Sequence, residues 1–290
     1  PARAPPPPPL APPPTAAPLA IPFPHPPPFS PPFVENPRMT HGWRGGAVGD
    51  AFGWLARGIG DVDGDGITDI VVSATGNAPF GSTNGTVYAY SGKSGRLLWK
   101  QVGAKGALLG SGIESAGDVD GDGRQDVVAG APGLNSVFVF SGRDGHQLFK
   151  LMGDSADVDL GMAVAGVGDV NGDGRPDIAA GAPSSRSSGS ATGRVYLFSG
   201  RDGARLAARD GTRDGESFGT TVGGSGGQII IGASAGGDRS VGRGYIFDKL
   251  NPAPRFIREA DSTGNAPVHM FGCGVGDVAG DETGGFYRTG

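Results

Sequence analysis

The chain has 290 residues, 56 of them glycine and 25 proline, and a formal net charge of −5. This acidic balance, without any basic run, argues against nucleic acid as a partner, because phosphate binding needs a concentrated surface of lysine and arginine. No apolar stretch is long enough for a membrane span, and a single cysteine, Cys273, excludes an internal disulfide.

Residues 1–37 form a proline-rich tail that holds 18 of the 25 prolines. Proline fixes φ and has no N–H donor, so helices and central strands are excluded here. We expect polyproline II, an extended conformation without internal hydrogen bonds. The tail is interpreted as a stiff spacer, with a docking arm for a neighbouring subunit or partner as the alternative. Hydroxylation and glycosylation of its prolines stay open.

A repeated segment dominates the rest of the chain. Three copies read GIGDVDGDGITDIVVSATG, SAGDVDGDGRQDVVAGAPG and GVGDVNGDGRPDIAAGAPS, and their first aspartates are 57 and 51 residues apart, at Asp61, Asp118 and Asp169. A weaker fourth copy begins at Ser217, and a truncated fifth begins at Met270. Repetition at this period is typical of an array of similar structural units.

Each copy predicts four short strands. The first is the run before the acidic loop, such as residues 51–59. The second is β-branched and follows the loop, at 70–73, 127–130, 178–181 and 229–232. The third is strongly alternating, with the aromatic and β-branched residues that mark a half-buried strand, at 86–90, 136–140, 194–198 and 244–247. A turn and a last strand close each unit, as at 97–102 and 147–152.

Four antiparallel strands in each repeat are typical of β-propeller blades. We therefore predict an all-β fold, a β-propeller of four-stranded blades preceded by the polyproline-II-like tail. The propeller domain is expected at 38–290, with blades near 47–103, 104–153, 154–211 and 212–262 and a partial fifth at 263–290. Residues 41–49 resemble the end of a final strand from a further blade.

The loops between the first and second strands carry the pattern D-x-[DN]-G-D-G-x-x-D. Alternate acidic positions direct several oxygens into one curled turn, and the glycines permit the φ values that such a curl needs. Hard oxygen ligands in this number favour Ca²⁺ over Zn²⁺ and Mg²⁺. We predict about three Ca²⁺ ions, with ligands from Asp61, Asp63, Asp65, Ile67, Asp69, Asp118, Asp120, Asp122, Arg124, Asp126, Asp169, Asn171, Asp173, Arg175 and Asp177. Ile67, Arg124 and Arg175 would contribute backbone carbonyls.

A solvated acidic turn and an EF-hand are the two other interpretations of these loops. A solvated acidic turn is disfavoured, because four carboxylates in nine residues repel one another unless a cation lies among them. An EF-hand needs glutamate at position 12 and flanking helices, whereas Val72, Ala129 and Ala180 stand there. The fourth copy has no acid in its loop, and the fifth has Ala279 and Gly285 at two ligand positions, so neither is expected to bind strongly.

Candidates for catalysis are weak. The histidines are isolated, at His25, His41, His146 and His269, and Cys273 has no histidine within its own repeat. We therefore expect no enzyme activity and no catalytic residue. Trp43, Trp54 and Trp99 are expected to fill space between blades, with stacking on sugar rings as the alternative.

The motifs resemble FG-GAP repeats. Phe52-Gly53, Phe218-Gly219 and Phe271-Gly272 match the Phe-Gly element, and Gly130-Ala131-Pro132 and Gly181-Ala182-Pro183 match the Gly-Ala-Pro element. These repeats build the integrin α-subunit propeller and other extracellular proteins, including a calcium-containing lectin. The resemblance implies calcium loops between the first two strands of a blade. The family usually closes with seven blades, whereas this chain has four repeats and a truncated fifth.

The function expected from the resemblance is a non-catalytic, calcium-binding adhesion or assembly module, extracellular or at the cell surface. Exposed strand edges invite association, so a protein partner or self-association is expected through these edges and the tail. A calcium-dependent lectin with a glycan ligand is the first alternative, and a polysaccharide-acting enzyme is the second.

Overall fold

The structure is a computed structural model that describes residues 39–76, 83–154, 159–186, 191–225, 227–234 and 242–259. The chain divides into two compact units, Pro1–Thr40 and His41–Gly290, and the features below belong to the second. The predictions for the tail at 1–37, for Cys273 and for the fifth repeat lie outside the described residues. No helix in the described ranges is long and apolar enough to cross a membrane.

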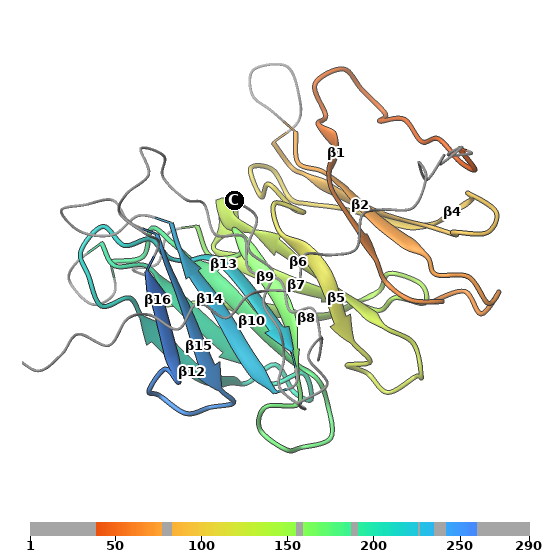
Figure 1. Cartoon of the computed structure of the whole chain (residues 1–290). Helices are drawn as coiled ribbons and strands as arrows, with labels where there is room; N and C mark the ends of the chain where they lie inside the picture. Colours follow the sequence, from red (N-terminus) through yellow and green to blue (C-terminus); the bar gives the residue numbers. More distant parts are fainter. Residues whose placement is uncertain are drawn as a thin grey trace, which may run out of the picture. The chain divides into compact units, whose positions relative to one another are not determined.

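The described part of the second unit consists of four sheets, each with four strands that pair antiparallel in chain order (Figure 1). We call them blades 1 to 4. Blade 1 contains β1 (Phe52–Gly58), β2 (Ile70–Ala74), β3 (Thr86–Tyr90) and β4 (Leu97–Val102). Blade 2 contains β5 (Ile113–Gly117), β6 (Asp126–Ala131), β7 (Ser136–Phe140) and β8 (Gln147–Met152), with a 3-10 turn, η1 (Pro132–Leu134), between β6 and β7.

The other two blades repeat this order. Blade 3 contains β9 (Ala163–Gly168), β10 (Asp177–Ala182), β11 (Arg194–Phe198) and β12 (Arg205–Asp210). Blade 4 contains β13 (Phe218–Ser225), β14 (Gln228–Ala233), β15 (Arg243–Asp248) and β16 (Phe256–Glu259). A four-stranded meander in every unit is the arrangement of propeller blades, so the predicted all-β propeller fold is confirmed.

The apolar core lies between blades. Alternate residues of a strand point to opposite faces of its sheet, and each central blade uses both faces. One cluster joins blades 1 and 2 and includes Val71, Val87, Val127 and Ala129. The second joins blades 2 and 3 and includes Val128, Val139, Ile178 and Tyr196. The third joins blades 3 and 4 and includes Ala179, Leu197, Ile229 and Tyr245. A single blade would leave one of these faces in water, so the blades stabilise each other.

Paired glycines let neighbouring blades approach closely. A Cβ on Gly130 in β6 would lie only 1.8 Å from the carbonyl oxygen of Gly161, which precedes β9 of the next blade. Gly181 and Gly219 repeat this contact between blades 3 and 4, with a corresponding distance of 2.0 Å. Gly161 and Gly219 also have φ of +97° and +90°, which side-chain-bearing residues rarely adopt. Between blades 2 and 3 and between blades 3 and 4, the glycine of a Gly-Ala-Pro element therefore lies against a glycine at the start of the next blade.

The fourth strand of blade 1 also donates to the turn after the third strand of blade 2. In β4, Nε1 of Trp99 donates to the carbonyl of Gly142 at 2.7 Å. Trp43, which precedes blade 1, donates to the carbonyl of Gly95 at 2.8 Å, and its ring lies 4.9 Å from that of Tyr90. Trp43 thus covers the turn of blade 1 as Trp99 covers that of blade 2, although the accepting carbonyls stand at different positions of the two turns and the segment of Trp43 is not a strand.

Replacing Trp99 with alanine tests the contact between blades 1 and 2. Trp99 is 6% exposed and packs against Phe140, so truncation opens a cavity and leaves the carbonyl of Gly142 without its donor. We expect Trp99→Ala to lower the free energy of unfolding by about 3–5 kcal/mol in urea titrations. Leu97→Ala is the matched control, because Leu97 lies in the same strand but is 40% exposed. Equal losses in the two variants would contradict this packing scheme.

Candidate metal centre

Three acidic loops of nine residues connect the first and second strands of blades 1, 2 and 3. They span residues 61–69, 118–126 and 169–177. Strands flank all three loops, which agrees with the rejection of an EF-hand. In blade 4 the corresponding strands stay paired as far as Ser225 and Gln228, so a short turn replaces the acidic loop.

The first aspartate of each loop organises the curl. In the first loop, the amides of Gly64 and Gly66 donate to the two carboxylate oxygens of Asp61 at 2.7 and 2.8 Å. Both glycines have positive φ, +83° and +87°, which turns their N–H groups inward. The hydrogen bond from Gly66, the largest of several causes, lowers the pKa of Asp61.

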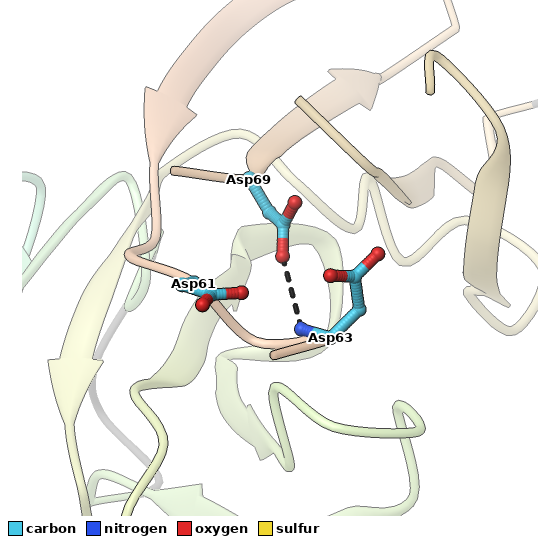
Figure 2. A group of neighbouring side chains, drawn as sticks. All are labelled: Asp61, Asp63 and Asp69. Carbon is cyan, nitrogen blue, oxygen red and sulfur yellow. Dashed lines mark hydrogen bonds between the residues drawn. The ribbon is translucent and has the colours of Figure 1, made fainter. Parts of the chain in front are cut away.

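Carboxylates converge inside the first loop. One oxygen from each of Asp61, Asp63 and Asp69 lies within 4.8 Å of the others. Figure 2 shows these three side chains turned toward a common space, two from the loop and one from its junction with β2. Asp65, also a predicted ligand, accepts hydrogen bonds from the amide of Ile67 at 3.0 Å and the hydroxyl of Ser91 at 3.2 Å.

The ninth residue of each loop has a second role that the sequence pattern does not indicate. In the second loop, Oδ2 of Asp126 accepts the amides of Val119 and Asp120 at 2.8 and 3.2 Å. Its Oδ1 accepts the amide of Gly142 at 3.0 Å, in the turn after β7. Asp69 and Asp177 make the corresponding bonds in blades 1 and 3. These buried carboxylates join each acidic loop to the turn beside it.

Burial makes the ninth position electrostatically costly. Asp69, Asp126 and Asp177 have no exposed surface. Desolvation raises the pKa of Asp126 to about 6 and also raises the pKa of Asp177, and the backbone hydrogen bonds only partly offset it. A cation held next to these groups would favour their ionised form.

The second and third loops differ in how their oxygens gather. Oxygens of Asp118, Asp120 and Asp122 lie within 4.8 Å of one another. In the third loop, Nδ2 of Asn171 donates to Oδ2 of Asp173 at 2.8 Å, and this bond, the largest cause, lowers the pKa of Asp173. Of the described residues, only the groups in the first two loops bring three carboxylates this close.

The donor set fits a hard divalent cation. All side-chain metal ligands predicted in the first loop are carboxylate oxygens, and no histidine or cysteine belongs to any of the three loops. Zn²⁺ is normally bound by nitrogen and sulfur ligands, whereas Ca²⁺ takes six to eight oxygens. The acidic clusters are therefore suited to Ca²⁺ through their side chains, and the predicted carbonyl ligands of Ile67, Arg124 and Arg175 stay a prediction.

Other predicted residues lie away from this centre. Trp99 is buried between blades, Trp43 covers the turn of blade 1, and Trp54 is 56% exposed. His41 reaches the carbonyl of Lys93, and His146 pairs with Asp144 in an exposed turn. His25 and His269 fall outside the described residues.

Two members of the Phe-Gly element have leucine in place of phenylalanine and were not predicted from the sequence. Leu109-Gly110 and Leu160-Gly161 occupy its place in blades 2 and 3, where Gly110 and Gly161 donate to the carbonyls of Gly130 and Gly181. The available signal was spacing, because each glycine precedes the first loop aspartate by eight residues, as Gly53 does.

The variant Asp126→Asn, measured in excess chelator, tests the structural role of the ninth loop position without a contribution from cation binding. An amide at this position offers one acceptor fewer and directs a donor at a backbone N–H. In excess chelator we expect the unfolding free energy to fall by about 1–3 kcal/mol, the cost of unsatisfied buried groups. Asp122→Asn, in the exposed part of the same loop, should change it by less than about 0.5 kcal/mol. Equal effects in chelator, measured by denaturant titration, would contradict the assignment.

Comparisons with known proteins agree with this architecture. A model of the FG-GAP repeat matches residues 160–198, and a model of an FG-GAP-like repeat matches residues 61–129. The chain is 31% identical over 182 residues to integrin alpha-PS5 of Drosophila melanogaster, covering 57% of this chain and 17% of that protein. It is 32% identical over 155 residues to integrin alpha-3 of Mus musculus, covering 48% and 14%.

Integrin alpha-V of Gallus gallus gives a similar match, 30% identical over 169 residues, covering 53% of this chain and 16% of that protein. The matched region thus spans only about a sixth of the length of these relatives.

Proposed function

Because this chain belongs to the FG-GAP repeat, integrin alpha-like family, we propose that it is a calcium-binding, non-catalytic module for extracellular adhesion or assembly. The observation that carries the proposal is the recurrence of one acidic loop at the same place in three consecutive blades. The adhesion part rests on the similarity to integrin alpha chains. It is independent of the calcium part, and the two parts are tested separately.

In this proposal the loop oxygens hold about three Ca²⁺ ions, one in each of blades 1 to 3. The charge of each ion would offset the repulsion among the carboxylates of its loop. Asp61, Asp63 and Asp69 in the first loop, and Asp118, Asp120 and Asp122 in the second, are the carboxylates whose oxygens already converge. The third loop would use Asp169, Asn171, Asp173 and Asp177.

The proposed role of calcium is structural. The unfolded loop has no preorganised arrangement of oxygens, so binding energy would stabilise the folded blade. The ninth aspartates connect the loops to the neighbouring turns, and those turns receive contacts from the preceding blades. Calcium would thereby stabilise the stacking of blades and the surface that they present to a protein partner.

Removing calcium from the purified chain tests this role. We expect the melting temperature to fall in excess EDTA and to recover on addition of Ca²⁺, since each site contributes about 2.7 kcal/mol at a free calcium concentration of about 100 times Kd. Asp65→Ala should reduce the gain from calcium, whereas Asp144→Ala, which removes an exposed aspartate outside the loops, should leave it unchanged. Identical melting curves with and without EDTA would overturn the calcium assignment.

A glycan array probed with the same protein tests the non-lectin part of the proposal. An adhesion or assembly module that acts through protein contacts should give no glycan signal above background in Ca²⁺. Reproducible binding to defined glycans that disappears in EDTA would contradict it.

A further inference from the structure

Arg124 reaches from the second acidic loop onto the first. It is the seventh residue of its own loop, but its Nη1 donates to the carbonyl of Val62 in the preceding blade. Its guanidinium covers Gly64, where a Cβ would lie 3.2 Å from Nη2. The positive charge of Arg124 therefore lies against the backbone of the first acidic loop.

Arg175 repeats this arrangement one blade further along. It is the seventh residue of the third loop, and its Nη1 lies 4.0 Å from Oδ1 of Asp118 in the second loop. A Cβ on Gly121 would overlap its guanidinium, so the arginine lies directly on that loop. The residue at the seventh position of the first loop is Ile67, which is 48% exposed. Blade 1 is the first blade of the described residues, and the seventh position is arginine only in the two loops that follow another acidic loop.

The three loops have the same formal charge once the arginines from the following blades are counted. The first loop contains four aspartates and receives Arg124, and the second contains four aspartates and receives Arg175. The third contains three aspartates, because Asn171 replaces one, and no acidic loop follows it in blade 4 to supply an arginine. With all carboxylates ionised, each loop together with its incoming arginine has a formal charge of −3.

Each acidic loop also has a basic residue near it in the sequence of its own blade, which does not change the comparison of loop charges. Lys93 donates to the carbonyl of Asp65 at 3.0 Å, and Arg201 donates to the carbonyl of Asp173 at 3.1 Å. Arg143 stands at the matching sequence position in blade 2. Blades 1 to 3 thus each have a basic residue at this sequence position, and the arginines from the following blades are what distinguish the loops.

We propose that Arg124 and Arg175 act as counter-charges between blades that lower the Ca²⁺ affinity of the preceding loop and hold that loop folded when no ion is bound. This inference rests on the proposed calcium function. The backbone of each arginine is part of one loop, whereas its guanidinium lies on the preceding loop. Ordering of a loop by Ca²⁺ therefore positions the guanidinium that acts on the loop before it, which couples adjacent sites.

The experiment follows each loop separately by NMR during a Ca²⁺ titration of the full chain. The amides of Gly66, Gly123 and Gly174 each donate to the first aspartate of their own loop, so each resonance reports on one site. We expect Arg124→Gln to lower the half-saturation concentration at Gly66 about three- to tenfold, as Coulomb repulsion between the ion and a nearby charge predicts. The resonance of Gly174 should titrate as in the wild type.

Arg175→Gln is the matched variant and should shift the titration of Gly123 in the same direction. Arg124→Lys keeps the charge and should stay close to the wild-type midpoint at Gly66. Lys105→Gln removes a charge from the connection between β4 and β5, at the opposite end of the blades from the acidic loops, and should change none of the three midpoints. In about 1 M salt, where the Debye length is about 3 Å, the effect of Arg124→Gln should shrink.

The outcomes separate the two proposals. If the three glycines respond to Ca²⁺ but Arg124→Gln and Arg175→Gln leave the midpoints at Gly66 and Gly123 within twofold of the wild type, about the precision expected of such midpoints, the counter-charge role is wrong and calcium binding stands. Equal shifts in Arg124→Lys and Arg124→Gln would also overturn it, because packing rather than charge would then be responsible. If no loop glycine responds to Ca²⁺ in the wild type, the proposed calcium function itself fails.

The metal-free protein gives a second measurement that does not depend on calcium. In excess EDTA we expect Arg124→Gln to melt at a lower temperature than Lys105→Gln, since the metal-free loop loses its counter-charge. An equal or higher melting temperature for Arg124→Gln would contradict the second half of the proposal.

Discussion

The buried aspartate at the end of each acidic loop is the interaction on which the site and its surroundings depend. Asp126 and its counterparts receive backbone N–H groups from two separate segments, the start of the acidic loop and the turn after the third strand. A carboxylate is suited to this role because its two oxygens can accept several hydrogen bonds at once. Its burial is expensive, as the raised pKa of Asp126 indicates, and the same oxygens lie at the base of the acidic loop.

This arrangement links the loops to the stacking of the blades. The turn that the buried aspartate fixes in blade 2 is the turn that accepts the indole N–H of Trp99 from blade 1. Between blades 2 and 3 and between blades 3 and 4, paired glycines also bring backbone against backbone. Since the apolar clusters all lie between blades, local order in a loop and packing between sheets stabilise each other.

Much of the architecture could be predicted from the sequence. The alternating segments at 86–90, 136–140 and 194–198 coincide with β3, β7 and β11, because successive side chains of a strand point to opposite faces of its sheet. The expectation that these strands are half-buried was wrong for β7 and β11, since neighbouring blades cover both of their faces. The loss of the acidic loop in the fourth repeat was equally readable, since its carboxylates are absent from the sequence. Phe-Gly elements with leucine in place of phenylalanine were missed, because the requirement there falls on the glycine.

The sequence by itself determined the repeat, the strand order within each blade and the presence of three oxygen-rich loops, since all of these follow from local pattern and side-chain chemistry. Only the tertiary structure decided which loop each charged side chain serves. Arg124 and Arg175 read as ordinary loop residues in their own repeats, yet their guanidinium groups lie on the preceding blade. The reason is that a propeller stacks segments about 50 residues apart, and the residues around an arginine in the chain do not show which distant segment its side chain contacts.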